Sequence, residues 1–313
     1  MNKKKIRLGY YKKSCNSNFA SPKNWYNKKL LEYFNIEIVD CKEADFVLFS
    51  EKKAHENIAY KIPPKAIRIF LTGENERPNF NHADYALTHD YIADTVRHLR
   101  FPELRHWIYP SILKPRNFKE LSERKVNFCN FMYSNANAKE RIAFFRVLSK
   151  YKKVDSVGNV LNNNDNVYIK DKMEFINTYK FTIAFENSSH PGYSTEKLIQ
   201  PLLQGSIPIY WGDTEIERDI NPDCFINTNN FDCFKDVVNR IIEIDNDDVL
   251  WEKYITAPIF KNNKMPEHFK EDKFINFFSK IFFSKKHQIP VWRKYCQFIF
   301  YYLNNLIRLK VSR

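Results

Sequence analysis

Short apolar runs alternate with segments of helical pattern along most of this chain, and no other feature limits its fold as strongly. Five runs in the first 115 residues have the length and composition of strands, at residues 6–11, 36–40, 46–50, 67–71 and 85–87. A helical pattern at 24–34 lies between the first two runs. Strands that alternate with helices are typical of a layered α/β domain built on a largely parallel sheet.

The alternation begins again after a polar stretch that contains Pro110 and Pro115 and runs to Arg124. Because 313 residues are enough for two domains, we predict an α/β fold with two Rossmann-like domains facing across a cleft. The first is residues 1–120, the second is 121–272, and a C-terminal segment of amphipathic helices follows at 273–313. The second domain has expected strands at 126–132, 181–186 and 207–211, and expected helices at 138–151, 172–177, 194–205 and 231–243.

The formal net charge of +13 is concentrated at the two ends of the chain. Residues 1–13 carry six cations and residues 273–313 carry nine, and neither segment contains an anion. Residues 14–272 therefore hold 35 cations against 37 anions and are close to neutral. Proteins that bind nucleic acid more often spread basic residues over the folded body. We therefore expect no nucleic-acid partner.

Signals for export or membrane insertion are missing from the sequence. The basic N-terminus leads directly into a strand-like run, without the apolar segment of a signal peptide, and no run approaches the length of a spanning helix. The six cysteines form no CxxC motif and no zinc spacing, so free thiols are expected. Together these features predict a cytoplasmic protein.

Glycine is scarce, and this limits how a nucleotide phosphate can be held. The chain has only six glycines, and none are spaced as in the dinucleotide fingerprint or the phosphate loop. The expected strand that ends at Phe185 instead delivers Glu186 and Asn187 to its carboxyl end, where open α/β sheets bind ligands.

A helix start follows that strand end after a short polar loop. Ser194 and Thr195 mark the start, and Glu196 and Lys197 lie in the first turn. Helix N-termini offer N–H groups to anions, a carboxylate suits vicinal hydroxyls, and an ammonium suits a phosphate. The spacing alone is equally compatible with an ordinary capped helix that carries a surface Glu and Lys.

These segments resemble the signature of bacterial α-1,3/4-fucosyltransferases, glycosyltransferase family 10. The resemblance covers roughly residues 67–280 and rests on ordered motifs: Thr72-Gly73-Glu74-Asn75 with Arg77-Pro78-Asn79-Phe80-Asn81, Ser134-Asn135-Ala136-Asn137 with Arg141, Phe185-Glu186-Asn187, Tyr193-Ser194-Thr195-Glu196-Lys197, and Ile207-Pro208-Ile209-Tyr210-Trp211-Gly212.

The resemblance implies a GT-B fold, GDP-fucose as the donor, and transfer of L-fucose to N-acetylglucosamine with inversion at the anomeric carbon. It implies no cofactor and no metal. The implied site residues are Glu74 as the general base, Arg141 and Lys197 as contacts to the diphosphate, Glu196 as the contact to the ribose, and Glu186, Asn187 and Tyr193 as the lining of the donor site.

The residue types fit this chemistry. An inverting transfer is one in-line displacement, so a single carboxylate must take the proton of the acceptor hydroxyl. Glu74 follows the expected strand at 67–71 and so lies at a carboxyl end, although a solvated loop glutamate has the same pattern. Two fixed cations stabilise the departing GDP without a metal.

One motif favours a metal. Asp245-Asn246-Asp247 is formally the DxD spacing by which other glycosyltransferases hold a divalent ion. Asp247 also fits the N-cap of a following helix, which is the interpretation we prefer.

The C-terminal segment contains two apolar stripes at helical spacing. The stripe within 274–283 is expected to pack on the body as a closing helix, and the basic aromatic stripe from Trp292 onward is expected to contact the inner face of the cytoplasmic membrane. Bacterial family members often place tandem seven-residue repeats before such helices. This chain has no such repeats, which leaves dimerisation through them in doubt.

The sequence thus favours an inverting α-1,3-fucosyltransferase that acts on N-acetyllactosamine-type acceptors, as in the synthesis of Lewis-type antigens on a lipopolysaccharide precursor. Three alternatives stay open: an α-1,4 or dual α-1,3/4 linkage, a GT-B transferase that uses another sugar nucleotide, and a basic protein without catalysis that binds membranes or nucleic acid.

Overall fold

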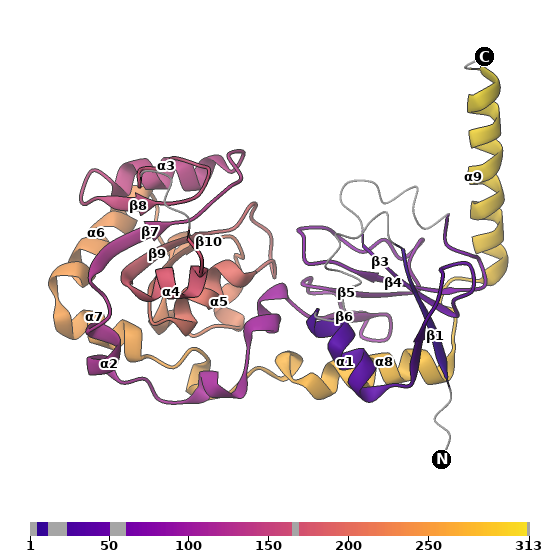
Figure 1. The fold of residues 1–313 in the computed structure, drawn as a ribbon, viewed down its shortest axis with the longest axis horizontal. Coiled ribbons are helices and arrows are strands. Elements are labelled where there is room, and N and C mark those ends of the chain that lie inside the picture. The colour runs from indigo at the N-terminus through magenta and orange to yellow at the C-terminus, as the bar shows by residue number, and fades with distance from the viewer. Residues whose placement is uncertain (1–4, 12–23, 51–60, 165–168, 312–313) are drawn as a thin grey trace. The chain divides into compact units, whose positions relative to one another are not determined.

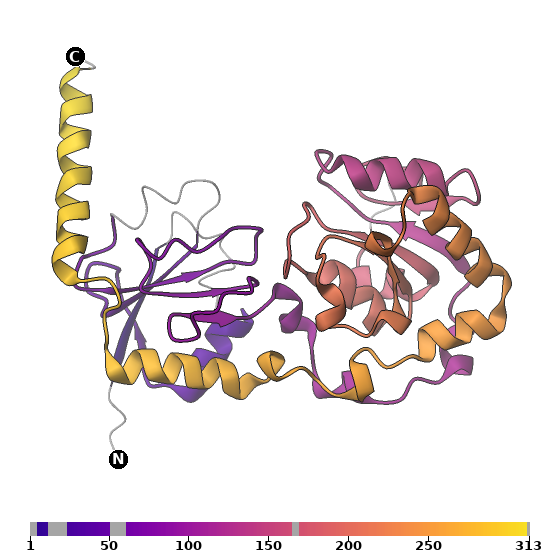
Figure 2. The same cartoon turned by 180° about the vertical axis from the view of Figure 1, so that it is seen from behind.

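A computed structural model describes residues 5–11, 24–50, 61–164 and 169–311, and the side chains of 304–311 are not described. The chain forms two compact units (Figures 1 and 2). The first consists of Met1–Phe101 with Glu267–Arg313, and the second is Pro102–Pro266. Both are α/β units, as the alternation of patterns predicted.

The first unit is built on a six-stranded parallel sheet. Its strand order is β2-β1-β3-β4-β5-β6, with β1 at Ile6–Tyr10, β2 at Ile36–Ile38, β3 at Phe46–Phe49, β4 at Ile67–Leu71, β5 at Tyr85–Thr88 and β6 at His98–Arg100. The central strands are buried on both faces, which is why they form mostly apolar runs in the sequence. Five of these strands were predicted, whereas β6 has only three residues and was missed.

Two helices cover one face of this sheet. They are α1 (Trp25–Tyr33) and α8 (Glu271–Ser284), and the side chains of both join the cluster of apolar residues over β1, β3, β4 and β5. The ring of Phe274 in α8 lies 5.1 Å from that of Trp25, and the ring of Phe282 lies 4.9 Å from that of Phe46. The apolar stripe at 274–283 is therefore the closing helix that its spacing predicted, and it completes the first unit.

The second unit is built on a five-stranded parallel sheet with the order β11-β10-β9-β7-β8. Helix α3 packs beside α6, and α4 packs beside α5. The strands are β7 (Asn127–Phe131), β8 (Val154–Ser156), β9 (Tyr179–Phe185), β10 (Ile207–Trp211) and β11 (Ile226–Asn227). The helices are α2 (Phe118–Ser122), α3 (Lys139–Leu148), α4 (Lys172–Asn177), α5 (Glu196–Leu203), α6 (Phe234–Asn246) and α7 (Asp248–Thr256).

Residues 102–120 pack with the second unit, although the sequence placed them in the first domain. A 3₁₀ helix at Glu103–Trp107 contacts α5, and the Leu104 N–H donates to the Ser194 carbonyl over 3.3 Å. Farther along, α2 packs on α7. The stretch that looked like a linker therefore forms short helices, and the boundaries of the units lie at 101/102 and 266/267.

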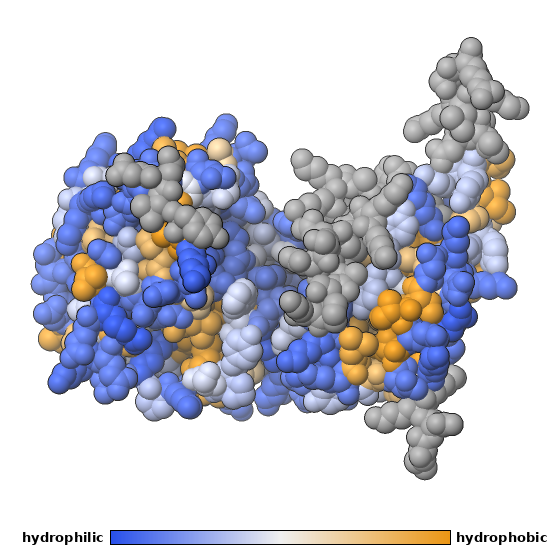
Figure 3. All heavy atoms as spheres, viewed as in Figure 1, coloured by the Kyte–Doolittle hydropathy of each residue, from blue (hydrophilic) through white to orange (hydrophobic). Residues whose placement is uncertain are grey.

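The C-terminal helix α9 (Val291–Val311) is attached to the first unit near its start. The Lys294 ammonium is buried and pairs with Asp84 at 2.5 Å, while the N–H groups of Gln288 and Ile289 donate to the other carboxylate oxygen. Most of the described apolar side chains of α9 are exposed, with Trp292 69% and Phe300 65% accessible. Figure 3 shows hydrophobic atoms at the surface of this helix. Among the described residues, no helix combines the length and apolarity that crossing a bilayer requires.

Candidate donor site

A cavity of about 210 Å³ opens beside β7 and β9 in the second unit. It lies between the carboxyl-terminal parts of these strands, helix α4 and the first turn of α5. We call it the β7–β9 cavity, and its lining includes Asn130, Tyr133, Asn135, Arg141, Lys172, Thr182, Asn187, Glu196 and Lys197. All of its lining residues belong to the second unit.

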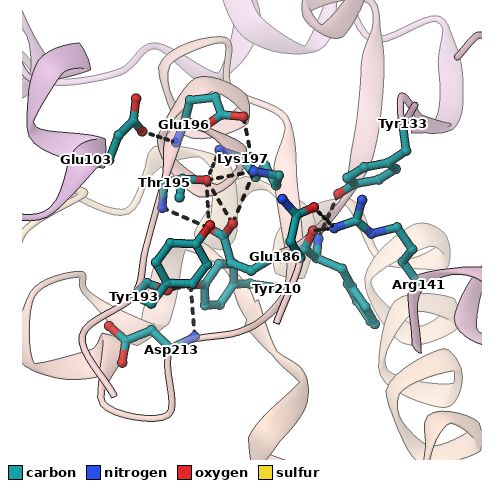
Figure 4. Close-up of polar contacts among 12 residues, drawn as sticks. Glu103, Tyr133, Arg141, Glu186, Tyr193, Thr195, Glu196, Lys197, Tyr210 and Asp213 are labelled. Carbon is teal, nitrogen blue, oxygen red and sulfur yellow. Dashed lines mark hydrogen bonds and ion pairs between the residues drawn. The ribbon is translucent and has the colours of Figure 1, made fainter. Parts of the chain in front are cut away.

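Arg141 is a buried cation that has no carboxylate partner in the described part of the chain. Its side chain is only 1% exposed, and its Nη2 donates to the Phe185 carbonyl and to Asn187 Oδ1, each over 2.9 Å. The guanidinium lies 3.9 Å from the ring centre of Tyr133 (Figure 4), and its Nε–H has no acceptor among the residues that the structure describes. Burial lowers the pKa of Arg141. A buried, unpaired guanidinium is costly, so this position favours an anionic ligand.

Glu186 lies behind the cavity wall and does not line it. Its carboxylate is fully buried and accepts hydrogen bonds from the Thr195 N–H (2.8 Å) and the Thr195 hydroxyl (2.9 and 2.8 Å to the two oxygens). The second oxygen is 3.2 Å from the Lys197 ammonium (Figure 4). Burial raises the pKa of Glu186 to about 7, although Lys197 acts against this shift. Glu186 therefore positions the start of α5.

Gly212 leaves space for that carboxylate. A Cβ atom at this position would lie 2.4 Å from Cγ of Glu186. This close approach explains why a glycine follows the apolar strand β10.

Lys197 and Glu196 form an ion pair in the first turn of α5. The Lys197 ammonium is within 3.2 Å of three oxygens, those of Thr195 Oγ1, Glu186 and Glu196. Burial lowers the pKa of Lys197, but the two carboxylates outweigh burial and raise the pKa above its ordinary value. Burial likewise opposes ionisation of Glu196, yet Lys197 and Lys172 hold its pKa below the usual range. The first turn thus carries a fixed carboxylate and a fixed ammonium.

The backbone N–H groups at the start of α5 are already used, contrary to our expectation that they would be open to an anion. The Glu196 N–H donates to the Glu103 carboxylate over 3.0 Å, and the Lys197 N–H donates to Thr195 Oγ1 over 3.4 Å. The Thr195 N–H donates to Glu186, so three side chains, Glu103, Thr195 and Glu186, satisfy this helix end. An anion in the cavity meets side-chain cations instead.

The structure brings together four of the six predicted donor-site residues. Arg141, Asn187, Glu196 and Lys197 line the β7–β9 cavity, whereas Glu186 and Tyr193 are buried and are not among its lining residues. The residues missed by sequence reasoning are Glu103, Tyr133 and Lys172. Thr195 was identified as a marker of the helix start, but its hydrogen bonds to Glu186 were not predicted. Tyr133 comes two residues after β7, so the rule that ligands bind beyond strand ends would have found it.

Glu74 belongs to the first unit. It follows the carboxyl end of β4, is half-buried, and its N–H donates to Thr72 Oγ1 over 3.0 Å. Nearby, Arg77 is hydrogen-bonded to Asn75 and forms an ion pair with the buried carboxylate of Asp90. The loop that carries Glu74 is therefore held at a strand end, and the role of Glu74 stays a prediction.

Both carboxylates of the DxD spacing have structural partners. Asp247 caps α7, because its side chain accepts from the N–H groups of Val249 (2.9 Å) and Leu250 (3.0 Å). Asp245 accepts from the Lys152 ammonium and the Tyr151 hydroxyl, each over 3.0 Å. The preferred interpretation of Asp247 as a helix cap is confirmed.

Comparison with known proteins agrees with this architecture. Residues 121–277 match the family model of the C-terminal part of glycosyltransferase family 10 (fucosyltransferase), and residues 12–108 match that of the α-(1,3)-fucosyltransferase FucT N-terminal domain. A crystal structure of an α1,3-fucosyltransferase superposes with a TM-score of 0.78 at 25% identity, over 93% of each chain. The protein is thus an α/β protein of the GT-B class. It belongs to glycosyltransferase family 10, the fucosyltransferase family.

Two curated relatives illustrate the range of the similarity. The α-(1,3)-fucosyltransferase FucT of Helicobacter pylori is 34% identical over 209 residues, which is 56% of this chain and 44% of that protein. A 4-galactosyl-N-acetylglucosaminide 3-α-L-fucosyltransferase of Pan troglodytes is 29% identical over 226 residues, 68% of this chain and 61% of that protein. The chain thus spans less than two thirds of the length of these relatives.

Proposed function

We propose that the protein transfers L-fucose from GDP-fucose to N-acetylglucosamine in N-acetyllactosamine-type acceptors, with formation of an α-1,3 linkage and inversion at the anomeric carbon. The observation that carries the proposal is the buried guanidinium of Arg141, which lines the β7–β9 cavity without a carboxylate partner among the described residues. Family membership and the name of the Helicobacter pylori relative support the donor and the linkage.

In this proposal the cavity binds the charged part of the donor. The Arg141 guanidinium donates charge-assisted hydrogen bonds to the diphosphate. Lys197, whose ammonium is held by three protein oxygens, contributes its positive charge beside the diphosphate. The Glu196 carboxylate, which is half-buried and ionised, accepts hydrogen bonds from the ribose hydroxyls. Asn187 lines the site beside Arg141. Glu186 acts through Lys197 and Thr195, so it is a positioning residue.

The transfer step is a single displacement. The acceptor hydroxyl attacks C1 of fucose while the bond between C1 and the phosphate oxygen breaks, and GDP leaves with the electron pair. Glu74 accepts the hydroxyl proton as the new bond forms. Fixed cations beside the leaving phosphate lower the barrier by stabilising the charge that develops there. No metal enters this scheme.

Product analysis tests the proposal. The protein is incubated with GDP-fucose and both isomers of N-acetyllactosamine, with and without EDTA, and the linkage in the product is determined. We expect an α-1,3-linked product in both conditions. An α-1,4-linked or mixed product would correct the linkage, turnover of UDP- or other GDP-sugars in place of GDP-fucose would replace the donor, and Mn²⁺-dependent activity would refute metal independence.

The raised pKa of Glu186 predicts that proton uptake accompanies donor binding. A diphosphate near Lys197 adds negative charge beside Glu186 and raises its pKa further above 7. Affinity for GDP-fucose should therefore rise as the pH falls from about 9 toward 7, about tenfold for each unit by which binding raises the pKa, and then level off.

Calorimetry in buffers of different ionisation enthalpy measures this proton uptake. GDP-fucose is the suitable ligand because its diphosphate is doubly esterified and does not titrate near pH 7. The nearby Lys172 also titrates with a lowered pKa, so Glu186→Gln is the variant that isolates the glutamate. Equal proton uptake by the variant and the wild-type protein would contradict the assignment to Glu186.

We also propose that α9 holds the enzyme at the inner face of the cytoplasmic membrane, where a lipopolysaccharide precursor with Lewis-type chains would be its acceptor. The exposed apolar residues of α9 support this, and cations flank them in the sequence. Truncation after Gln297 removes most of the stripe and keeps the buried pair of Lys294 and Asp84. We expect this truncation to abolish salt-sensitive binding to anionic vesicles. Equal binding of both chains would refute a membrane role.

The alternative of a basic binding protein without catalysis is tested by the same preparation. It predicts tight binding of nucleic acid at physiological salt and no binding of GDP. The proposed enzyme predicts the reverse, since the cations of the β7–β9 cavity belong to a body whose net charge is close to zero.

A further inference from the structure

The β7–β9 cavity is lined by three cations, and they differ in how far the protein itself satisfies them. The three are Arg141, Lys172 and Lys197, and Glu196 is the only anion in the lining. Lys197 has three oxygens within 3.2 Å, which match the three N–H donors of an ammonium. Its donors are therefore engaged by Thr195, Glu186 and Glu196.

Lys172 is different. It is the first residue of α4, and the side chain of Asp171 fixes the start of that helix by accepting from the N–H groups of Met173 (2.7 Å) and Glu174 (3.2 Å). Within the described residues, the Lys172 ammonium has neither a hydrogen bond nor an ion pair. The side chain is half-buried in the cavity wall. Burial lowers its pKa, and Glu196 partly offsets this effect. Its three donors are available to a ligand.

The charges around the cavity show why the availability of the Lys172 ammonium matters for binding an anion. When Glu186 and Glu196 are ionised, they cancel the charges of Arg141 and Lys197. Lys172 then supplies the net positive charge of the site. A nucleoside diphosphate sugar carries two negative charges on its diphosphate, and a third develops as the nucleoside diphosphate leaves. Without Lys172 the ionised site would be neutral and would have little electrostatic preference for that charge.

We propose that Lys172 binds the diphosphate of the nucleotide sugar and is a donor-binding residue in addition to Arg141 and Lys197. The proposal rests on the proposed function of the β7–β9 cavity. It assigns a role to α4, which contributes no residue to the motifs that carry the resemblance. The group that Lys172 binds in this proposal is a diphosphate esterified at both ends before transfer, and the terminal diphosphate of the leaving nucleotide after transfer.

The test compares GDP binding by the full chain and its variants in calorimetry. Lys172→Met removes the charge and keeps the apolar stem, Lys172→Arg restores a cation, and Lys170→Met removes an exposed lysine two residues away. We expect Lys172→Met to bind GDP about 10-fold to 100-fold more weakly at low salt. Lys170→Met should bind as the wild type does, and Lys172→Arg should recover most of the affinity.

Salt dependence separates a direct contact from a change in the shape of the cavity. Loss of a charge contact weakens the salt dependence of GDP binding, whereas a distorted cavity weakens binding equally at low and high salt. Unfolding temperatures should be similar for all variants because Lys172 has no hydrogen-bond or ion-pair partner among the described residues to lose. If Lys172→Met binds as tightly as wild type, or loses affinity equally at both salts, the proposal fails while the proposed function stands. If the wild-type protein binds no GDP, the proposed function fails and this inference fails with it.

Discussion

Replacement of Lys197 by alanine is expected to lower the rate of fucose transfer by about 100-fold to 1,000-fold, the cost of removing one fixed charge-stabilising donor from an active site. The ammonium lies between Glu186, Glu196 and Thr195, so in the proposed site its loss removes both a positive charge beside the diphosphate and the group that fixes the Glu196 carboxylate. The effect should appear in kcat as well as in KM for GDP-fucose. Steady-state kinetics with varied GDP-fucose measure both quantities.

The fold should survive this substitution. Without Lys197 the pKa of Glu186 rises further and the buried carboxyl takes up a proton, while Thr195 still contacts both of its oxygens. Circular dichroism and thermal unfolding check this. Lys150→Ala, which removes an exposed lysine from the same unit, is the matched control and should keep full activity. Turnover by Lys197→Ala close to that of the control would show that Lys197 is not part of the donor site.

Replacement of Glu74 by glutamine is expected to lower transfer by about 100-fold to 10,000-fold, the usual contribution of a general base. Glutamine keeps the size of the side chain and cannot accept the proton of the acceptor hydroxyl. Because the lining of the β7–β9 cavity belongs entirely to the second unit, GDP-fucose should bind to this variant with unchanged affinity. Transfer assays and calorimetry on the same preparation separate the two effects.

A matched control for this variant is Glu43→Gln, which changes an exposed glutamate in the first unit. It should leave both transfer and donor binding unchanged. A Glu74→Gln protein that transfers fucose at the rate of the control would exclude Glu74 as the base. A variant that loses donor binding together with transfer would assign Glu74 to the donor site instead.

Sequence patterns predicted the fold best where a single segment is buried along its whole length or along one regular face. The strands β3, β4, β9 and β10 are mostly buried on both faces and rich in apolar residues, so their runs stand out without any knowledge of the fold. The helical spacing of the apolar residues at 274–283 likewise indicated that this face of the helix is buried. Short elements such as β6 and β8 carry no such signal, because three residues cannot show a period.

The site was harder to predict because its geometry depends on contacts between distant segments. Glu186 and Lys197 were both identified, but only the structure shows that Glu186 lies behind the cavity and holds Lys197 in place. Glu103 satisfies an N–H of α5 from 93 residues away, which no local pattern indicates. Lys172 reaches the cavity through the packing of α4 beside α5, and a lysine at a helix start looks ordinary in sequence.

The central claim, that the β7–β9 cavity holds the diphosphate of the donor, is tested most directly by a crystal structure of the full chain with GDP bound. We predict diphosphate oxygens within hydrogen-bond distance of the Arg141 guanidinium and the Lys172 ammonium, with ribose hydroxyls at Glu196. A well-ordered GDP whose diphosphate contacts none of these side chains would contradict the claim.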